Sequence, residues 1–343
     1  MQTQFLKNTQ SDIKAAGAIL ANGGLVAIPT ETVYGLAADA LNGKAVARIF
    51  EAKGRPMDNP LIVHVASFED ISRFRLVSEI PELAYVLAKR FWPGPLTMIM
   101  KKGKAIPDEV SAGLDTVAVR FPSHPVAQEI IRAAGTPLAA PSANLSGSPS
   151  PTTAQHVMND MDGRIDAVLD GGSCEVGVES TVITLVPEVP RVLRPGGVTV
   201  EQLSDALGGI DVDDAVLHQL KEGERAASPG MKYKHYAPKA NVILLKCTDD
   251  EFVRYVNQNA GVGVAALCCD EDLPLLGGVK TLSLGKRGDY DAQAHALFDC
   301  LRRVDGYGGV LTVYSRLPQT DGVGLAVYNR LIRAAGFEVI DLA

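Results

Sequence analysis

The chain has 343 residues, 46% hydrophobic and 21% charged, which is typical of a folded globular protein and excludes a disordered one. Because one hydrophobic core stops growing at about 250–300 residues, this length predicts two domains. A net charge of −7 argues against binding nucleic acid over a broad surface, since such binding depends on neutralising phosphates. A local basic pocket is still compatible with this charge.

The sequence predicts a cytoplasmic protein with no membrane contact. Its N-terminal stretch MQTQFLKNTQSDIK lacks the apolar run of a secretory signal, and no segment reaches the ~20 apolar residues of a membrane span. The cysteines never have the C-x-x-C spacing of zinc or redox sites, so we expect reduced, mostly buried thiols and no metal site. They are Cys174, Cys247, Cys268, Cys269 and Cys300.

Helical and β-rich patterns alternate from residue 11 to about residue 199, which predicts one α/β domain. Two of the β-rich runs, LVAIPT and PLAAPSA, stop at a proline followed by small hydroxyl residues. Proline cannot continue a central strand, so we expect irregular loops there. These loops carry Thr30, Thr32, Ser142 and Asn144.

The second half of the chain predicts a linker and a smaller domain. A helical patch, EQLSDALGG, is followed by KEGERAASPGMKYKHYAPKA, which has too few apolar residues for a core and is predicted to be an interdomain linker. Strand and helix patterns then alternate from NVILLK to GLAVYNRLIRAAG, which predicts a parallel, Rossmann-like three-layer domain. The predicted boundaries are residues 8–200, 201–239 and 240–343.

Two polar clusters come first along the chain. Residues 29–35, PTETVYG, place hydroxyls at a strand end, where they either satisfy their own backbone or meet a ligand. Residues 53–60, KGRPMDNP, follow a helix, and cations there often serve the helix dipole. The prolines fix the loop, however, which favours Lys53 and Arg55 as phosphate binders. His64 follows in an apolar strand and by itself is more typical of a core histidine.

Two further clusters leave alternatives open. Arg120 lies in a strand of small apolar residues, and because a buried arginine is rarely unpaired, it meets either an internal carboxylate or an anion that enters a site. Residues 142–150 hold five short polar side chains and no charge, which is typical of either a surface loop or a loop that binds a nucleotide.

The remaining candidates are GVEST at residues 177–181, RPG at 194–196, and the linker segment 228–238. Two lysines and three aromatic rings within residues 232–236 suggest that the linker is ordered against the rest of the protein. Standard nucleotide, zinc-protease and serine-hydrolase motifs are absent from the sequence. Any phosphate site must therefore be built from scattered lysines and arginines.

Eight motifs in one order resemble the threonylcarbamoyl-AMP synthase family in its long, two-domain form. They are PTETVYGL, KGRPMDNPLIVHV, WPGPLT, GLDTVAVRFP, APSANLSGSPSPT, GVESTVI, LRPG and SPGMKYKHYAP, and together they span almost the whole chain. The resemblance implies a twisted α/β catalytic domain with a concave basic cavity and a Rossmann-like accessory domain. It also implies the synthesis of L-threonylcarbamoyladenylate and pyrophosphate from L-threonine, bicarbonate and ATP, with Mg²⁺ accompanying ATP.

The resemblance further implies that separate transfer proteins use the product. They would modify the adenosine beside the anticodon of tRNAs that read codons beginning with A. Direct tRNA binding by this chain is left open. The linker segment 228–238 would fold over the nucleotide as a lid.

Two sets of site residues are carried over from the family's motifs. L-threonine would contact Thr32, His64, Arg120, the backbone of Ala140, and Ser180, with Arg120 holding the substrate carboxylate in a bidentate fork. The nucleotide would contact Lys53, Arg55, Asn59, Thr116, Ser142, Ser150, Arg194 and Tyr236. Lys53, Arg55 and Arg120 would be catalytic through positioning and charge, without a covalent intermediate.

Two alternatives belong to other functional classes. One is an RNA-binding or ribosome-associated module, against which the negative net charge and the lack of RNA-stacking motifs weigh. The other is carbamoyl transfer in hydrogenase maturation, in which a related domain occurs beside zinc-finger cysteines. This sequence has no such cysteines.

Overall fold

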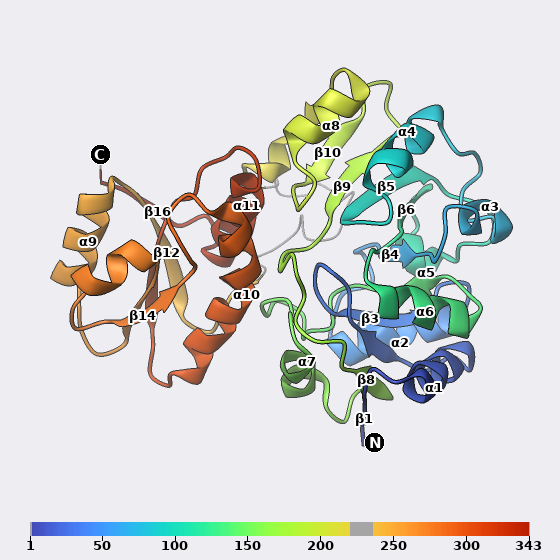
Figure 1. Cartoon of the computed structure of the whole chain (residues 1–343), viewed down its shortest axis with the longest axis horizontal. Coiled ribbons are helices and arrows are strands. Elements are labelled where there is room, and N and C mark those ends of the chain that lie inside the picture. The colour runs from blue at the N-terminus through green and yellow to red at the C-terminus, as the bar shows by residue number, and fades with distance from the viewer. Residues whose placement is uncertain (1, 220–235, 343) are drawn as a thin grey trace.

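The structure, a computed structural model, describes residues 2–219 and 236–342. These residues form two β-sheets with their own helices, and the two sheets lie side by side (Figure 1). Within the described ranges, no helix has the length and apolar character needed to span a membrane. The predicted two-domain α/β architecture is confirmed, whereas the boundaries at residues 200 and 239 stay a prediction.

The first sheet is mixed and has 11 strands. In spatial order the strands are β1 (Gln4–Leu6), β8 (Ala167–Leu169), β2 (Val26–Ile28), β3 (Gly35–Asp39), β7 (Leu138–Ala139), β4 (Ile62–His64), β6 (Thr116–Arg120), β5 (Leu96–Lys101), β9 (Thr181–Thr184), β10 (Arg191–Arg194) and β11 (Asp211–Val212).

Helices cover both faces of this sheet because its strands are apolar on both sides. On β3, Leu36 and Ala38 pack into one core while Ala37 packs into the other, as alternation along a strand requires. The helices α1 (Gln10–Ala21) and α6 (Pro125–Ala134) pack together on the Ala37 side. On the other side lie α2 (Gly43–Lys53), α4 (Glu82–Phe91), α7 (Ala154–Met161) and α8 (Val200–Leu207), with the short helices α3 (Asp70–Arg73) and α5 (Asp108–Ser111) at its margins. Ala215 of the short helix η1 (Asp214–Val216) packs in a separate cluster with Ile62, Ala118 and Leu193.

Both predicted irregular loops are present, and the sheet brings them together. Strand β2 ends immediately before Pro29, and β7 ends two residues before Pro141. A β-bridge joins Gly35 to Ser142, so the loop after β2 lies against the loop after β7. The parallel pairing of β4 with β6 places His64 directly opposite Arg120. Four polar clusters that are far apart in sequence therefore converge at one place.

The second sheet is parallel and has five strands, as the alternating pattern predicted; its Rossmann-like classification stays an interpretation. In spatial order they are β14 (Lys280–Ser283), β13 (Val264–Cys268), β15 (Thr312–Arg316), β12 (Asn241–Lys246) and β16 (Val339–Asp341). One face packs against α9 (Asp249–Gln258), near η2 (Asp270–Leu275), and the other against α10 (Tyr290–Gly306) and α11 (Gly324–Ala334). The residues of this sheet and its helices are called the accessory domain below.

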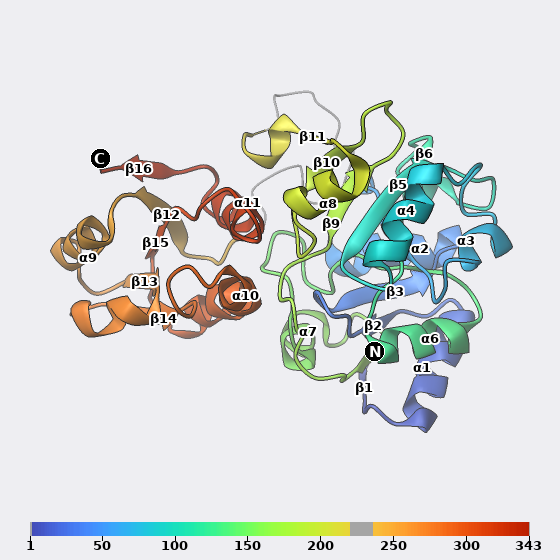
Figure 2. The ribbon, with the colours of Figure 1, turned by 45° about the horizontal axis from the view of Figure 1, so that its top comes forward.

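Helices α10 and α11 form the side of the accessory domain that faces the first sheet (Figure 2). Arg302 of α10 forms a bidentate ion pair with Asp160 of α7, with Nη2 2.8 Å from Oδ2. Its guanidinium also donates to the carbonyl oxygen of Pro149 at 2.5 Å. Since Arg302 and Asp160 are mostly buried, this contact fixes the loop before Ser150 against the accessory domain.

The cysteines are free thiols, as predicted. Cys174, Cys268 and Cys300 are buried, and Cys247 and Cys269 are partly buried. Burial raises the pKa of Cys174, Cys268 and Cys300 to about 12, so these thiols stay protonated at neutral pH.

Candidate active site

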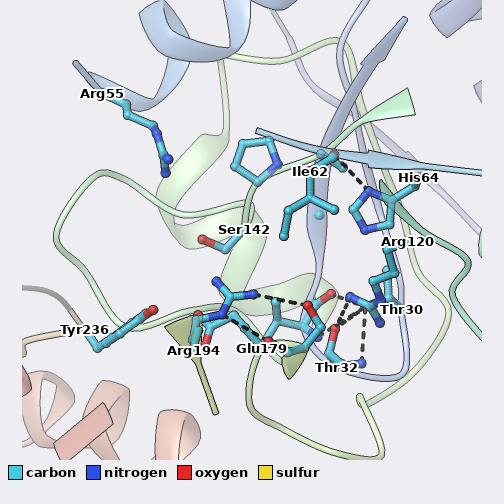
Figure 3. A pocket seen from close by; sticks show the side chains of 15 residues that line it. Thr30, Thr32, Arg55, Ile62, His64, Arg120, Ser142, Glu179, Arg194 and Tyr236 are labelled. Atoms are coloured by element: carbon cyan, nitrogen blue, oxygen red, sulfur yellow. Dashed lines mark hydrogen bonds between the residues drawn. The ribbon is translucent and has the colours of Figure 1, made fainter. Parts of the chain in front are cut away.

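A pocket opens where the polar clusters meet, between the strand ends of the first sheet and Tyr236 (Figure 3). Its lining is rich in hydroxyls and guanidinium groups and contains no cysteine. It consists of Thr30, Thr32, Val33, Gly35, Arg55, Ile62, His64, Arg120, Ala140, Pro141, Ser142, Glu179, Ser180, Arg194 and Tyr236. All five residues predicted to bind L-threonine are among them, as are four of the eight predicted to bind the nucleotide.

Arg120 stands at one end of the pocket and is held by two neighbours from the loop after β2. Its Nη2 lies 2.7 Å from Oε1 of Glu31 in a buried ion pair, and its Nη1 donates to Oγ1 of Thr32 at 2.9 Å. Burial alone would raise the pKa of Glu31, but the attraction of Arg120 outweighs it and lowers that pKa below 4.5. Arg120 therefore meets an internal carboxylate, one of the two alternatives that the sequence left open. A substrate carboxylate would share the guanidinium of Arg120 with Glu31.

His64 lies beside Arg120 and presents a neutral ring to the pocket. Its Nδ1 is 3.2 Å from the carbonyl oxygen of Ile62. A carbonyl only accepts, so Nδ1 carries the proton and Nε2 is left as an acceptor. Burial, and then the charge of Arg120, lower the pKa of His64 from 6.5 to about 3. At neutral pH the ring can therefore accept a hydrogen bond from a ligand hydroxyl.

The low pKa of His64 makes stability depend on pH. Below pH 6.5 the unfolded chain binds a proton at this residue that the folded protein does not bind until pH falls to about 3. Stability should therefore fall with decreasing pH, with His64 contributing a slope of about 1.4 kcal/mol per pH unit. We expect the His64→Gln variant to lose stability less steeply between pH 6.5 and 4.5 in denaturant titrations.

His124 also has a lowered pKa and therefore also makes stability fall with decreasing pH. The test therefore compares the slope of the wild type with that of the variant, and a slope of zero is not expected. A variant His124→Gln serves as the matched control. Parallel stability curves for the wild type and His64→Gln would contradict the inference.

Arg55 lines the opposite end of the pocket and lies next to Asn59. Arg55 Nη2 makes only long contacts, 3.4 Å each, to the carbonyl oxygens of Asn59 and Pro60. In the described part of the chain, Arg55 Nε and Asn59 Oδ1 are buried without a hydrogen-bond partner. Burial lowers the pKa of Arg55 to about 10, which leaves it charged at neutral pH. Buried polar groups are normally satisfied, so these atoms indicate a ligand site.

Arg194 lies between the two ends and is fixed by its neighbour in the pocket wall. Its Nε donates to the carbonyl oxygen of Ser180 at 3.0 Å, and its Nη2 donates to Oγ of Ser180 at 3.1 Å. The Ser180 hydroxyl is in turn 2.8 Å from Oγ1 of Thr97. This arrangement orients the guanidinium in the pocket wall.

Tyr236 closes the pocket on the side of the accessory domain. It is buried, its ring lies 5.3 Å from that of Phe298, and its φ of 65° is unusual for a residue other than glycine. The next residue, Ala237, donates its N–H to the carbonyl oxygen of Gly147 at 3.0 Å. The rest of the predicted lid, residues 228–235, lies outside the described residues.

Four predicted nucleotide ligands are not part of the pocket lining. Lys53 Nζ donates to the carbonyl oxygens of Ser142 and Asn144 at 2.5 and 2.6 Å, and burial lowers its pKa well below the usual value. Ser150 donates to Glu179 at 2.5 Å. Asn59 is described above, and Thr116 lies four residues before Arg120, on the same face of β6. Contact of these residues with a nucleotide stays a prediction.

The sequence interpretation assigned no role to Glu179, which lines the pocket and bonds to Arg330 of α11. The sequence offered two signals, the GVEST cluster that contains Glu179 and the position of Arg330 inside the apolar helix pattern GLAVYNRLIRAAG.

The pocket's own carboxylates do not fit a metal held by the protein. Glu31 is paired with Arg120, and Glu179 is paired with Arg330. Across residues 2–219 and 236–342, no group of three histidine, cysteine or acidic side chains is placed to hold a metal ion. A hard cation such as Mg²⁺ needs oxygen ligands that are not already neutralised by arginines.

The similarity of this chain to known proteins extends over both domains. Residues 18–196 match a family model described as "Telomere recombination", and residues 198–336 match the "Threonylcarbamoyl-AMP synthase, C-terminal domain" model. The chain is 46% identical to the threonylcarbamoyl-AMP synthase of Bacillus subtilis, covering 98% of this chain and 97% of that one. It is 45% identical to that of Pyrococcus abyssi, covering 96% and 95%.

A solved structure matches in both domains. The structure of P. abyssi Sua5 complexed with L-threonine has a TM-score of 0.92 and 42% identity, and the match covers 100% of both chains.

Proposed function

Because this chain belongs to the threonylcarbamoyl-AMP synthase family, we propose that the pocket between Arg120 and Arg55 is where it makes threonylcarbamoyl-AMP. The chain is an enzyme of threonylcarbamoyladenosine formation in tRNA. The observation that carries the proposal is the similarity over both domains to a relative whose structure contains L-threonine. The pocket's arginine-rich lining supports it, because ATP and bicarbonate are anionic and L-threonine carries a carboxylate.

L-threonine would occupy the end that holds Arg120 and His64. Its carboxylate would accept hydrogen bonds from Arg120, which is already oriented by Glu31 and Thr32. Its hydroxyl would donate to Nε2 of the neutral His64. Ser180 and the backbone of Ala140 complete this end of the lining. A substrate without the hydroxyl would leave Nε2 unpaired, which favours threonine over its apolar analogues.

ATP would occupy the end that holds Arg55, Arg194 and Tyr236. The threonine amine takes up carbon dioxide with loss of a proton, or bicarbonate with loss of water, to form a carbamate. A carbamate oxygen then attacks the α-phosphorus as pyrophosphate leaves. Negative charge develops on the phosphate oxygens, and Arg55 and Arg194 are placed to offset it. Lys53 holds the carbonyl groups of Ser142 and Asn144, so its bonds support a positioning role for the loop that carries Ser142.

Mg²⁺ would enter on the phosphates of ATP, since Glu31 and Glu179 are occupied by arginines. Separate transfer proteins would carry the product to tRNA. The cytoplasmic location stays a prediction, and direct tRNA binding by this chain is left open.

Pyrophosphate release from ATP tests the proposal. We expect release only when L-threonine and bicarbonate are both present, together with a product of the mass of threonylcarbamoyl-AMP. Release that does not need L-threonine would contradict the proposal. No release, combined with tight binding of tRNA in a filter assay, would favour the RNA-binding alternative.

A further inference from the structure

Arg330 of α11 is a fully buried arginine of the accessory domain that reaches into the wall of the pocket. Its Nε donates to Oε2 of Glu179 at 2.9 Å, and its Nη2 donates to the Glu179 carbonyl oxygen at 3.2 Å. Its Nη1 donates to the carbonyl oxygen of Pro195 at 2.7 Å. These contacts fall next to two site residues, since Ser180 follows Glu179 and Arg194 precedes Pro195.

Glu179 is an unexpected group at this position. It lines the pocket beside Arg194, and its second carboxylate oxygen accepts from Oγ of Ser150 at 2.5 Å. An uncompensated carboxylate here would repel the phosphates of ATP and would be costly to bury. Arg330 supplies the compensating charge from the other domain.

We propose that Arg330 is a positioning residue for the use of ATP: it neutralises Glu179 and fixes the chain segments that carry Ser180 and Arg194. The inference rests on the proposed function, because it assumes that ATP binds in this pocket. The accessory domain thereby contributes to the active site through a charge, in addition to the contact of Phe298 with Tyr236.

The charges around Glu179 predict how a variant would respond to pH. Arg330 faces it from α11, Arg194 from β10, Tyr236 from the chain before β12, and Lys53 from the end of α2. Burial alone would raise the pKa of Glu179, but Arg330 and then Arg194 outweigh it and lower that pKa below 4.5. Without Arg330 the pKa of Glu179 should rise, so that acidification neutralises the carboxylate and removes its repulsion of ATP.

The test is steady-state pyrophosphate release by the full chain, with KM measured separately for ATP and L-threonine from pH 6 to 8.5. For Arg330→Gln we expect KM for ATP to rise by about 10-fold or more at pH 8 and to fall as pH decreases, with a smaller change in KM for L-threonine. The double variant Glu179→Gln with Arg330→Gln should recover most of the ATP affinity and lose the added pH dependence.

Arg333→Gln is the matched control. Arg333 lies one turn along α11, is also buried, and donates across the domain boundary to the carbonyl oxygen of Ala215 at 2.6 Å, outside the pocket. We expect this control to keep the wild-type KM for ATP.

Three results would overturn the inference: an unchanged KM for ATP in Arg330→Gln, an equal rise in Arg333→Gln, or a double variant no better than the single one. If Arg330→Gln does not fold, the double variant decides, provided that it folds. A wild-type KM for ATP in the double variant would support charge compensation, and a large rise in that KM would contradict it. If the double variant is unfolded as well, Arg330 serves folding and the inference is wrong. Absence of threonine-dependent release by the wild type would instead refute the proposed function.

Discussion

Arg120→Ala should raise the KM for L-threonine on the order of 100-fold, while the KM for ATP changes much less, because two charge-assisted hydrogen bonds to the substrate carboxylate are lost. The same change removes the partner of Glu31, which is 3% exposed. Breaking a buried ion pair at one side costs about 3–5 kcal/mol, so the midpoint of thermal unfolding should also fall. Initial rates at varied L-threonine and a thermal melt measure the two effects.

A double variant separates these two effects. Glu31→Gln combined with Arg120→Met leaves no bare buried charge, so its stability should approach that of the wild type while its use of L-threonine stays defective. Glu31→Gln alone leaves the guanidinium of Arg120 available to the substrate, so this variant should retain much of the affinity for L-threonine. A double variant that regains the wild-type KM for L-threonine would show that Arg120 acts only on stability.

Arg55→Met should show the opposite combination, a large loss in the use of ATP with stability unchanged or increased. Arg55 is 9% exposed, and its contacts to the carbonyl oxygens of Asn59 and Pro60 are long, so the folded protein gains little from its charge. One charge-assisted bond to phosphate is worth roughly 1.5–3 kcal/mol, which corresponds to an increase of about 10- to 150-fold in KM for ATP.

Arg48→Met is a suitable control for Arg55. Arg48 lies on α2, the helix that ends two residues before Arg55, and pairs with Asp166 at 3.2 Å on the surface, outside the pocket. This variant should keep the wild-type KM for ATP. A marked fall in the unfolding midpoint of Arg55→Met without a change in KM for ATP would place Arg55 in the structural framework instead.

Local features of the fold could be predicted because their causes are local. Proline at residues 29 and 141 stops the preceding strands, and alternating patterns after residue 240 give the parallel sheet. The opposition of His64 and Arg120 could not be predicted in the same way, since it depends on the register of β4 against β6.

Partners of buried charges were the least predictable part of the site. Arg120 alone left an internal carboxylate and an anionic substrate equally open, and only the fold brings Glu31 to it. The bond between Glu179 and Arg330 joins residues separated by 151 positions and by the boundary between the two domains. The partners of Lys53 could not be predicted either. They are carbonyl groups in a loop about 90 residues away, which local sequence patterns do not reveal.

A crystal structure of the wild-type protein with L-threonine and a non-hydrolysable ATP analogue tests the location of the active site most directly. We predict the threonine carboxylate on Arg120, its hydroxyl within hydrogen-bond distance of His64 Nε2, and the phosphates between Arg55 and Arg194. Density for L-threonine away from Arg120, or for the triphosphate outside this pocket, would contradict the assignment.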